Sequence, residues 1–115
     1  MSIYSDEYLM KCKAFNLKGI IPAVSVMKTD EFFIELKAIS DKLIKEIGLE
    51  GFSSFLMEGQ YLVQLWTAHF LLLNITNDKI KIASINMIKE YTNNPLTREV
   101  AKKENEWLKI NFPNV

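Results

Sequence analysis

One stretch of sequence decides the fold, YLVQLWTAHFLLLN, which occupies residues 61–74. Its apolar residues lie at nearly every angle around a helix axis, so no face of that helix is left for water. The stretch is shorter than the roughly 20 apolar residues that span a bilayer. Four polar residues also interrupt it: Gln64, Thr67, His69 and Asn74. We therefore predict a helix buried between other helices, with Trp66 in the core, and no membrane span.

Helical signals continue on both sides of this stretch. The helix breakers are few, with prolines at 22, 95 and 113 and glycines at 19, 48, 51 and 59, and they fall between segments of helical period. We expect helices over 5–17, over 29–47, from Asn77 or Asp78 onward, and from Pro95 to Phe112, with a short helical turn over 51–57. The segment from Ile20 to Met27 is left open between a loop and a strand.

The helix expected after residue 77 shows how the pattern predicts packing. An apolar stripe recurs along it at helical spacing: Ile80, Ala83, Met87 and Tyr91, widened by Ile82, Ile85 and Ile88. Such a stripe is buried when one helix stacks against the next. Five or six helices with short connections in 115 residues therefore predict an all-α fold, an antiparallel helical array in a single domain over residues 1–115.

Four segments carry a resemblance to a known family: FFIELKAISDKLIKEIGLEG, VQLWTAHFLLL, KIASINMIKEY and REVAKKENEWLK. From Phe33 to Phe112 the chain resembles small bacterial HEAT-like helical-repeat proteins, some of which resemble immunity proteins of contact-dependent growth inhibition and other polymorphic toxin systems. The resemblance implies HEAT-like helix-turn-helix stacking, in which Ala68 allows close approach. The usual repeat reads VR-x-x-A-A, whereas this chain has Gln64 in place of the arginine and Thr67 in place of the first alanine.

The composition argues against several classes of function. The chain has 14 basic and 14 acidic residues, so it lacks the basic excess that neutralises phosphates, and we expect no direct binding of nucleic acid. With one histidine, one cysteine and no recognised ligand spacing, we expect neither a metal nor an organic cofactor. The N-terminus lacks a basic start followed by an apolar core, so we expect a cytoplasmic protein.

We expect the residues that could be catalytic to have structural roles instead. His69 has apolar helical neighbours, and we predict a packed or partly exposed histidine. Cys12 has no identifiable base beside it, so we predict a small packed thiol. Glu99, Glu104 and Glu106 stand close to two lysines in the sequence, and we assign them to an exposed face of mixed charge. We predict no catalytic residue, and an enzyme is the least favoured of the functions considered.

Charge is distributed unevenly along the chain. Residues 29–61 hold seven acids and three lysines, whereas residues 79–115 hold seven bases and four acids. No basic residue occurs between Lys45 and Lys79. An acidic region of this kind attracts a basic partner and speeds its association, although helices also carry charge merely to face solvent. The candidate partner-binding residues are Glu31, Glu35, Asp41, Glu46, Glu50 and Glu58.

Two functions other than catalysis follow from these observations. The resemblance implies an immunity protein that neutralises a cognate toxin, and an acidic surface would occlude the active site of a nuclease toxin, which is basic because it holds phosphates. The alternative is a helical adaptor or regulatory module with a different protein partner. Both hypotheses imply a protein partner, no membrane association, and a monomer in the free state. A neighbouring gene for a toxin-like domain would favour the first.

Overall fold

The computed structural model describes residues 2–74 and 77–115, and in that part of the chain the protein is helical with no strand. The predicted all-α fold is confirmed. The elements are α1 (Ile3–Leu17), α2 (Pro22–Lys28), α3 (Glu31–Ser53), η1 (Ser54–Met57), α4 (Val63–Leu73), α5 (Asp78–Thr92), η2 (Pro95–Thr97) and α6 (Arg98–Asn111), where η marks a short 3-10 helix. None of these helices combines the length and the apolar character needed to cross a membrane.

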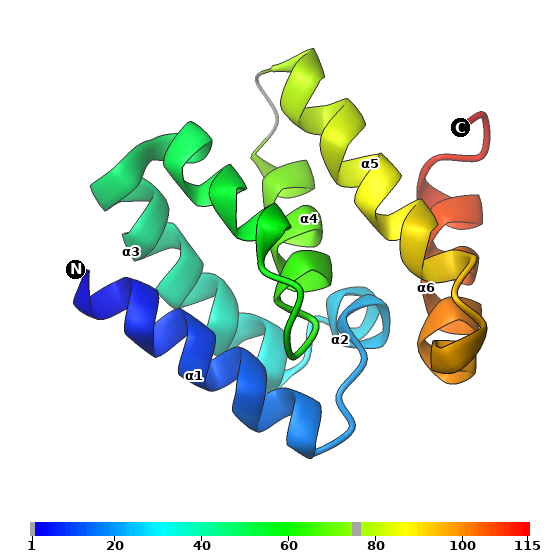
Figure 1. The fold of residues 1–115 in the computed structure, drawn as a ribbon, viewed down its shortest axis with the longest axis horizontal. Coiled ribbons are helices and arrows are strands. Elements are labelled where there is room, and N and C mark those ends of the chain that lie inside the picture. Colours follow the sequence, from blue (N-terminus) through cyan, green and yellow to red (C-terminus); the bar gives the residue numbers. More distant parts are fainter. Residues whose placement is uncertain (1, 75–76) are drawn as a thin grey trace.

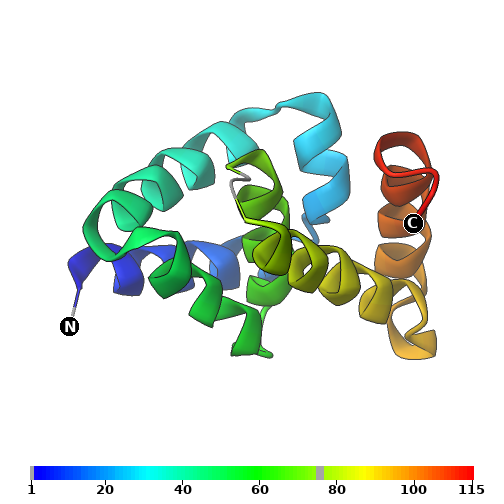
Figure 2. The same ribbon diagram turned by 90° about the horizontal axis from the view of Figure 1, so that it is seen from above.

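The long helices form an array in which successive members reverse direction (Figure 1). α1 lies along the first part of α3, and α5 runs back beside α4 before α6 reverses again. Seen from above, α4 lies inside the array, where α1, α2, α3 and α5 all contact it (Figure 2). The predicted helical array is therefore observed, with the most apolar helix at its centre.

The core is built around α4, as its sequence predicts. Residues 63 and 65–71 are buried, and the Trp66 side chain is fully enclosed. Trp66 stacks on Phe70 with ring centroids 5.8 Å apart, and it meets Phe15 of α1 at 6.1 Å. The helix begins two residues later than predicted, at Val63, because the two residues before it have left-handed φ angles of 52° and 59°.

The segment left open between a loop and a strand, from Ile20 to Met27, is mostly helix. α2 begins at Pro22, where the missing N–H breaks no helical hydrogen bond and the fixed φ suits a first helical residue. Ile21 is extended, with φ −96° and ψ 124°, as expected before a proline. Both alternatives were wrong because the proline that keeps the preceding helix from continuing also begins the next one.

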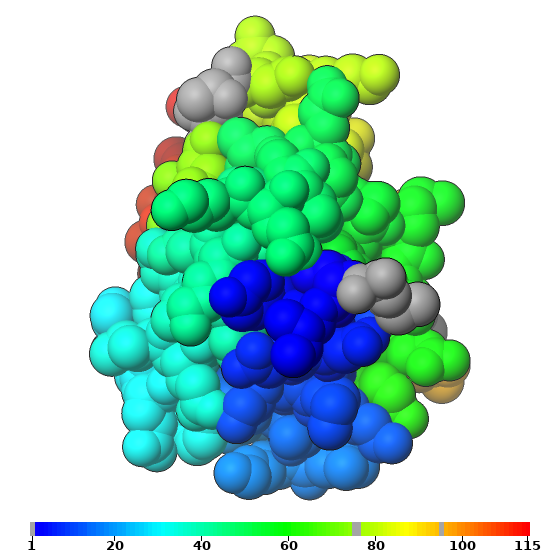
Figure 3. Space-filling model, turned by 90° about the vertical axis from the view of Figure 1, so that its left-hand side faces the viewer, coloured from blue at the N-terminus to red at the C-terminus, as the bar shows by residue number. Residues whose placement is uncertain are grey.

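α3 is longer than predicted and contains a kink. It continues past the predicted end at Ile47 and reaches Ser53. Gly48 has φ 80° and ψ 167°, which glycine adopts without steric cost, and the chain turns sharply there (Figure 1). Beyond the kink, the distal part of α3 continues into η1, which packs against α4. In Figure 3, α1 (blue) lies between α3 (cyan to green) and the green segment that follows α3 in the chain.

Candidate protein-binding surface

The six acidic residues predicted to bind a partner are spread over the surface and do not form one patch. Glu31 lies in the first turn of α3, where its charge favours the helix N-terminus. Glu35 pairs with Lys11 of α1, and Asp41 pairs with Lys37 at 2.8 Å between Oδ2 and Nζ. Exposed pairs of this kind are worth only about 0–1 kcal/mol, but they partly neutralise the two carboxylates.

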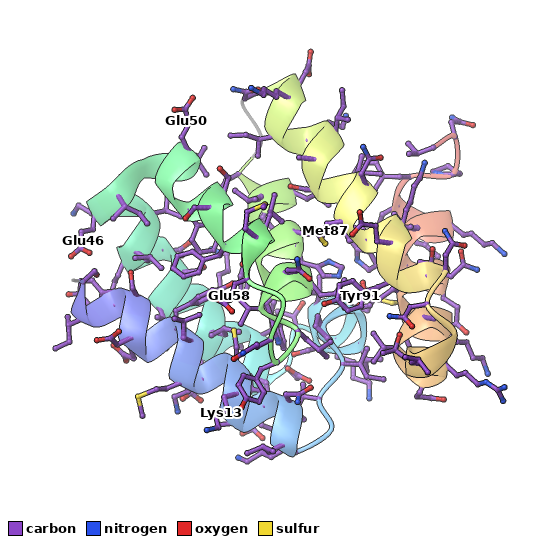
Figure 4. All side chains as sticks on the ribbon, viewed as in Figure 1. Lys13, Glu46, Glu50, Glu58, Met87 and Tyr91 are labelled. Atoms are coloured by element: carbon purple, nitrogen blue, oxygen red, sulfur yellow. The ribbon has the colours of Figure 1, made fainter. Side chains whose placement is uncertain are left out.

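The other three acids, Glu46, Glu50 and Glu58, lie before and after the kink and at the end of η1 (Figure 4). Glu46 and Glu50 are exposed, and Glu58 is half-buried. None of the three forms an ion pair with another residue of the described ranges, 2–74 and 77–115. Glu50 lines a groove beside α5, whereas Glu58 lines a smaller hollow that also includes Lys13. Glu46 lines neither hollow, so the three unpaired acids do not share one site.

A groove of about 540 Å³ lies between α5 and the distal part of α3 with η1. We call it the α5 groove, and we call its α3 side, residues 49–57, the α3–η1 wall. The residues that give the groove its character are Glu50, Leu56 and Met57 on the α3–η1 wall and Ile80, Ala83 and Met87 on α5. Met57 is 87% exposed at the rim. The groove is therefore mostly apolar, open to solvent and bordered by one acid, Glu50, and one base, Lys79.

Part of the apolar stripe that the sequence predicts on α5 lines this groove, although Ile80, Met87 and Tyr91 also pack against the edge of the core. The stripe consists of Ile80, Ala83, Met87 and Tyr91. Ala83 is exposed and the other three residues are half-buried. The buried residues of α5 are instead Ser84, Ile85 and Ile88. α5 thus has two apolar faces, one covered by the protein and one that lines the groove.

A chain of hydrogen bonds connects the two walls of the α5 groove through α4. The Tyr91 hydroxyl donates to Gln64 Oε1 at 3.0 Å, and Gln64 Nε2 donates to the Leu56 carbonyl oxygen at 2.8 Å. Burial raises the pKa of the Tyr91 phenol, and the nearby carboxylates of Glu90 and Glu104 raise it further. The phenol therefore stays protonated and keeps donating at neutral pH, which holds α5 at a fixed distance from η1.

The polar residues that interrupt the apolar run of α4 each bond to a different part of the array. Gln64 reaches η1 and α5, as described above. The Thr67 hydroxyl is hydrogen-bonded to the Tyr8 hydroxyl of α1 at 2.9 Å. His69 reaches α6, where its Nε2 lies 2.7 Å from Glu104 Oε1. These bonds satisfy polar groups in the core, and they fix where the neighbouring helices sit on α4.

The Glu104 carboxylate is buried, and its predicted place on an exposed face was wrong. Glu104 is 0% exposed, whereas Glu99 and Glu106 are exposed as predicted. Its position explains the difference, because Glu104 shares the inward face of α6 with Trp107 and Leu108, three and four residues later. The signal in the sequence that could have predicted this burial is the position of Glu104 in the same helical stripe as two apolar residues.

Three helices meet at this carboxylate. Oε1 accepts from His69 of α4, and Oε2 accepts from the Ala23 N–H in the first turn of α2 at 2.9 Å. The His69 ring also meets Trp107 edge-on, with centroids 4.4 Å apart. The predicted packed histidine is confirmed, and its Nδ1 is buried without a hydrogen-bond partner. Because both side chains are sealed from solvent, a substrate has no path to them in this conformation.

No cluster of three or more metal-ligating side chains lies within residues 2–74 and 77–115. His69 and Glu104 are two adjacent side chains that could each bind a metal, but no third such side chain lies close to them in this part of the chain. A zinc ion needs at least three protein ligands and usually four in a structural site. The buried pair therefore acts as a hydrogen-bonded link between helices.

Cys12 lies in the interior of α1 and is 0% exposed, so the predicted packed thiol is confirmed. Burial raises the pKa of the thiol well above its ordinary value, and a hydrogen bond with Tyr8 offsets this only in part. Because the thiolate is the reactive form, we expect Ellman's reagent to react at least about 100-fold more slowly with the folded protein than with the protein in urea. Equal rates of thionitrobenzoate release would place Cys12 at the surface.

Comparisons with protein families, with curated proteins and with solved structures find no match to this chain. A function can therefore be inferred only from the groove and the positions of the acidic residues.

Proposed function

We propose that this chain is a cytoplasmic immunity protein that binds and neutralises a basic toxin domain, and that it is a monomer before it binds. The observation that carries the proposal is the α5 groove, an open apolar surface with Glu50 on its α3–η1 wall and Lys79 on the other wall. Residues 46–58 include three acids and no base. Apolar residues that a protein leaves in an open groove are typical of binding sites, and acids around such a site favour a cationic partner.

The buried polar groups give no support to an enzymatic function. His69 and Glu104 have no exposed side-chain surface, and neither lines the α5 groove or the hollow beside Glu58. General acid–base catalysis needs the group within hydrogen-bond reach of its substrate. Partner binding is therefore the function that the accessible residues support best.

Reversing Glu46, Glu50 and Glu58 together to lysine should slow association with a basic toxin domain by about tenfold or more at low salt, because attraction between opposite charges steers the encounter. The measurement is the association rate at several salt concentrations, together with survival of cells that express the toxin-like domain of a neighbouring gene. Raising the salt should slow the association of the wild type and bring its rate closer to that of the triple lysine variant, because added ions screen exposed charges.

A matched control carries the same change of net charge at other exposed acids, Glu7, Glu99 and Glu106. This control should associate nearly as fast as the wild type and should protect cells. An equal fall in association rate for both variants would show that only net charge matters and not the position of the three acids. If the wild type protects against no toxin-like domain at all, the immunity function is wrong, and the adaptor alternative takes its place.

A further inference from the structure

We infer that the α5 groove receives one amphipathic helix of the partner, with its apolar side chains against α5 and its lysines or arginines against the α3–η1 wall. This inference rests on the proposed function and specifies how the partner is held. It assigns a distinct role to each wall of the groove.

The spacing of the α5 residues suits a helix. Ile80, Ala83 and Met87 follow one another at steps of three and four, so they form a straight apolar row about 10 Å long. A bound amphipathic helix presents anchors at the same spacing, i, i+3 or i+4, and i+7. The small Ala83 side chain lies between two larger ones, which leaves a recess for an incoming apolar side chain.

The composition of the groove agrees with this occupant. Met57 and Met87 stand on opposite walls. Methionine is flexible and polarizable, so it adapts to apolar partners, and helix-binding grooves use it for this reason. The 87% exposure of Met57 leaves it available for such a contact.

Charge sets the orientation of the bound helix. Glu50 is the acid on the α3–η1 wall, whereas Glu46 lies before the kink at Gly48 and Glu58 lines a different hollow. The one basic residue that lines the groove is Lys79, which stands on the opposite wall near the start of α5. A cationic flank of the partner helix is therefore attracted to the α3–η1 wall and repelled from the start of α5.

The groove is already shaped for binding because internal bonds hold its walls apart. Gln64 accepts from Tyr91 on the α5 side and donates to the Leu56 carbonyl on the η1 side. A site whose walls are held in place loses less conformational entropy when a ligand binds. Gln64 is thus a positioning residue for the groove and does not line it.

The test uses a defined probe, a stapled helical peptide of about 14 residues with leucines at i, i+3 and i+7 and lysines along one flank. The protein carries ¹³C-methyl methionine, and binding is followed by NMR. We expect the peptide to shift the methyl signals of Met57 and Met87. Met10 and Met27 lie outside the groove, are 71% and 51% exposed, and should not shift. Shifts at Met10 or Met27 alone, or at no methionine, would overturn the inference.

Two changes test apolar fit and charge separately. Ala83→Gln fills the recess and should weaken peptide binding by about tenfold or more, whereas Ala14→Gln, at an exposed alanine of α1, should leave it unchanged. A peptide with glutamates in place of its lysines should also bind at least about threefold more weakly, because Glu50 on the α3–η1 wall repels it. Equal binding by Ala83→Gln, or by the acidic peptide, contradicts the inference.

The same variants separate this inference from the proposed function. If Ala83→Gln protects cells from a toxin as well as the wild type does, while the triple lysine variant fails, the partner binds at the acids without a helix in the groove. If the peptide binds as expected and no toxin-like domain is neutralised, the groove accepts a helix but the immunity function is wrong.

Discussion

Trp66→Ala lowers the free energy of unfolding by about 3–5 kcal/mol, because it removes a large aromatic side chain that no neighbour can replace. Trp66 is fully enclosed in α4 and is stacked on Phe70. It also contacts the ring of Phe15, so its loss opens a cavity between α1 and α4. The measurement is urea unfolding followed by circular dichroism, which does not depend on tryptophan fluorescence.

Two other variants show whether the lower free energy of unfolding comes from the burial of Trp66. Trp66→Phe keeps an aromatic ring beside Phe70 and should cost less than the alanine variant. Leu17→Ala removes a side chain that is 73% exposed and should change the free energy of unfolding by no more than about 0.5 kcal/mol. An unfolding midpoint for Trp66→Ala equal to that of the wild type would mean that Trp66 does not pack in the core.

The helices themselves were predictable because their signals are local. The apolar residues of α3 recur at helical steps, and those of α4 cover every side of the helix, which requires burial. Capping residues also act over a few positions only: Asn77 accepts at the start of α5 as expected, whereas Asp30 caps α3, which begins at Glu31, two residues later than predicted. Element boundaries were less accurate, since Gly48 was expected to end a helix that resumes after a kink.

The groove was not predictable from the same signals. A stripe of apolar residues at helical spacing has the same form whether a helix covers it or it faces a groove. Ile80 and Met87 fit the pattern as well as buried Ile85 and Ile88 do. Which face is covered depends on where the α3–η1 wall lies, and this position is set by the kink at Gly48, whose φ of 80° the periodicity of apolar residues does not specify. Of the six acids predicted to bind, Glu50 lines this groove.

The buried pair of His69 and Glu104 was also missed, because its partners are 35 residues apart in the chain. Glu104 stands between charged neighbours, in the segment KKENEW, and local composition predicts a solvated face. Only its register with Trp107 and Leu108 indicates the inward face. The N–H of Ala23, which also binds the carboxylate, belongs to a helix that was not predicted.

Replacing either member of this pair should destabilise the protein by about 3–5 kcal/mol, because the remaining group stays buried without its partner. Glu104→Met leaves His69 with both ring nitrogens unpaired and removes the acceptor of the Ala23 N–H. His69→Leu leaves the carboxylate with one hydrogen bond from Ala23 in a water-free site. The measurement is urea unfolding of each single variant at neutral pH.

The double variant, His69→Leu with Glu104→Met, should cost less than the two single changes together, by about 1–3 kcal/mol, because both polar groups leave the core at once. Tyr8→Phe is the control for the cycle, since Tyr8 bonds to Thr67 on another side of α4 and shares no hydrogen-bond partner with Glu104. Its cost should add to that of Glu104→Met within about 0.5 kcal/mol. Additive costs for His69 and Glu104 as well would mean that the 2.7 Å contact carries no coupling, and that it does not help to hold α4 against α6.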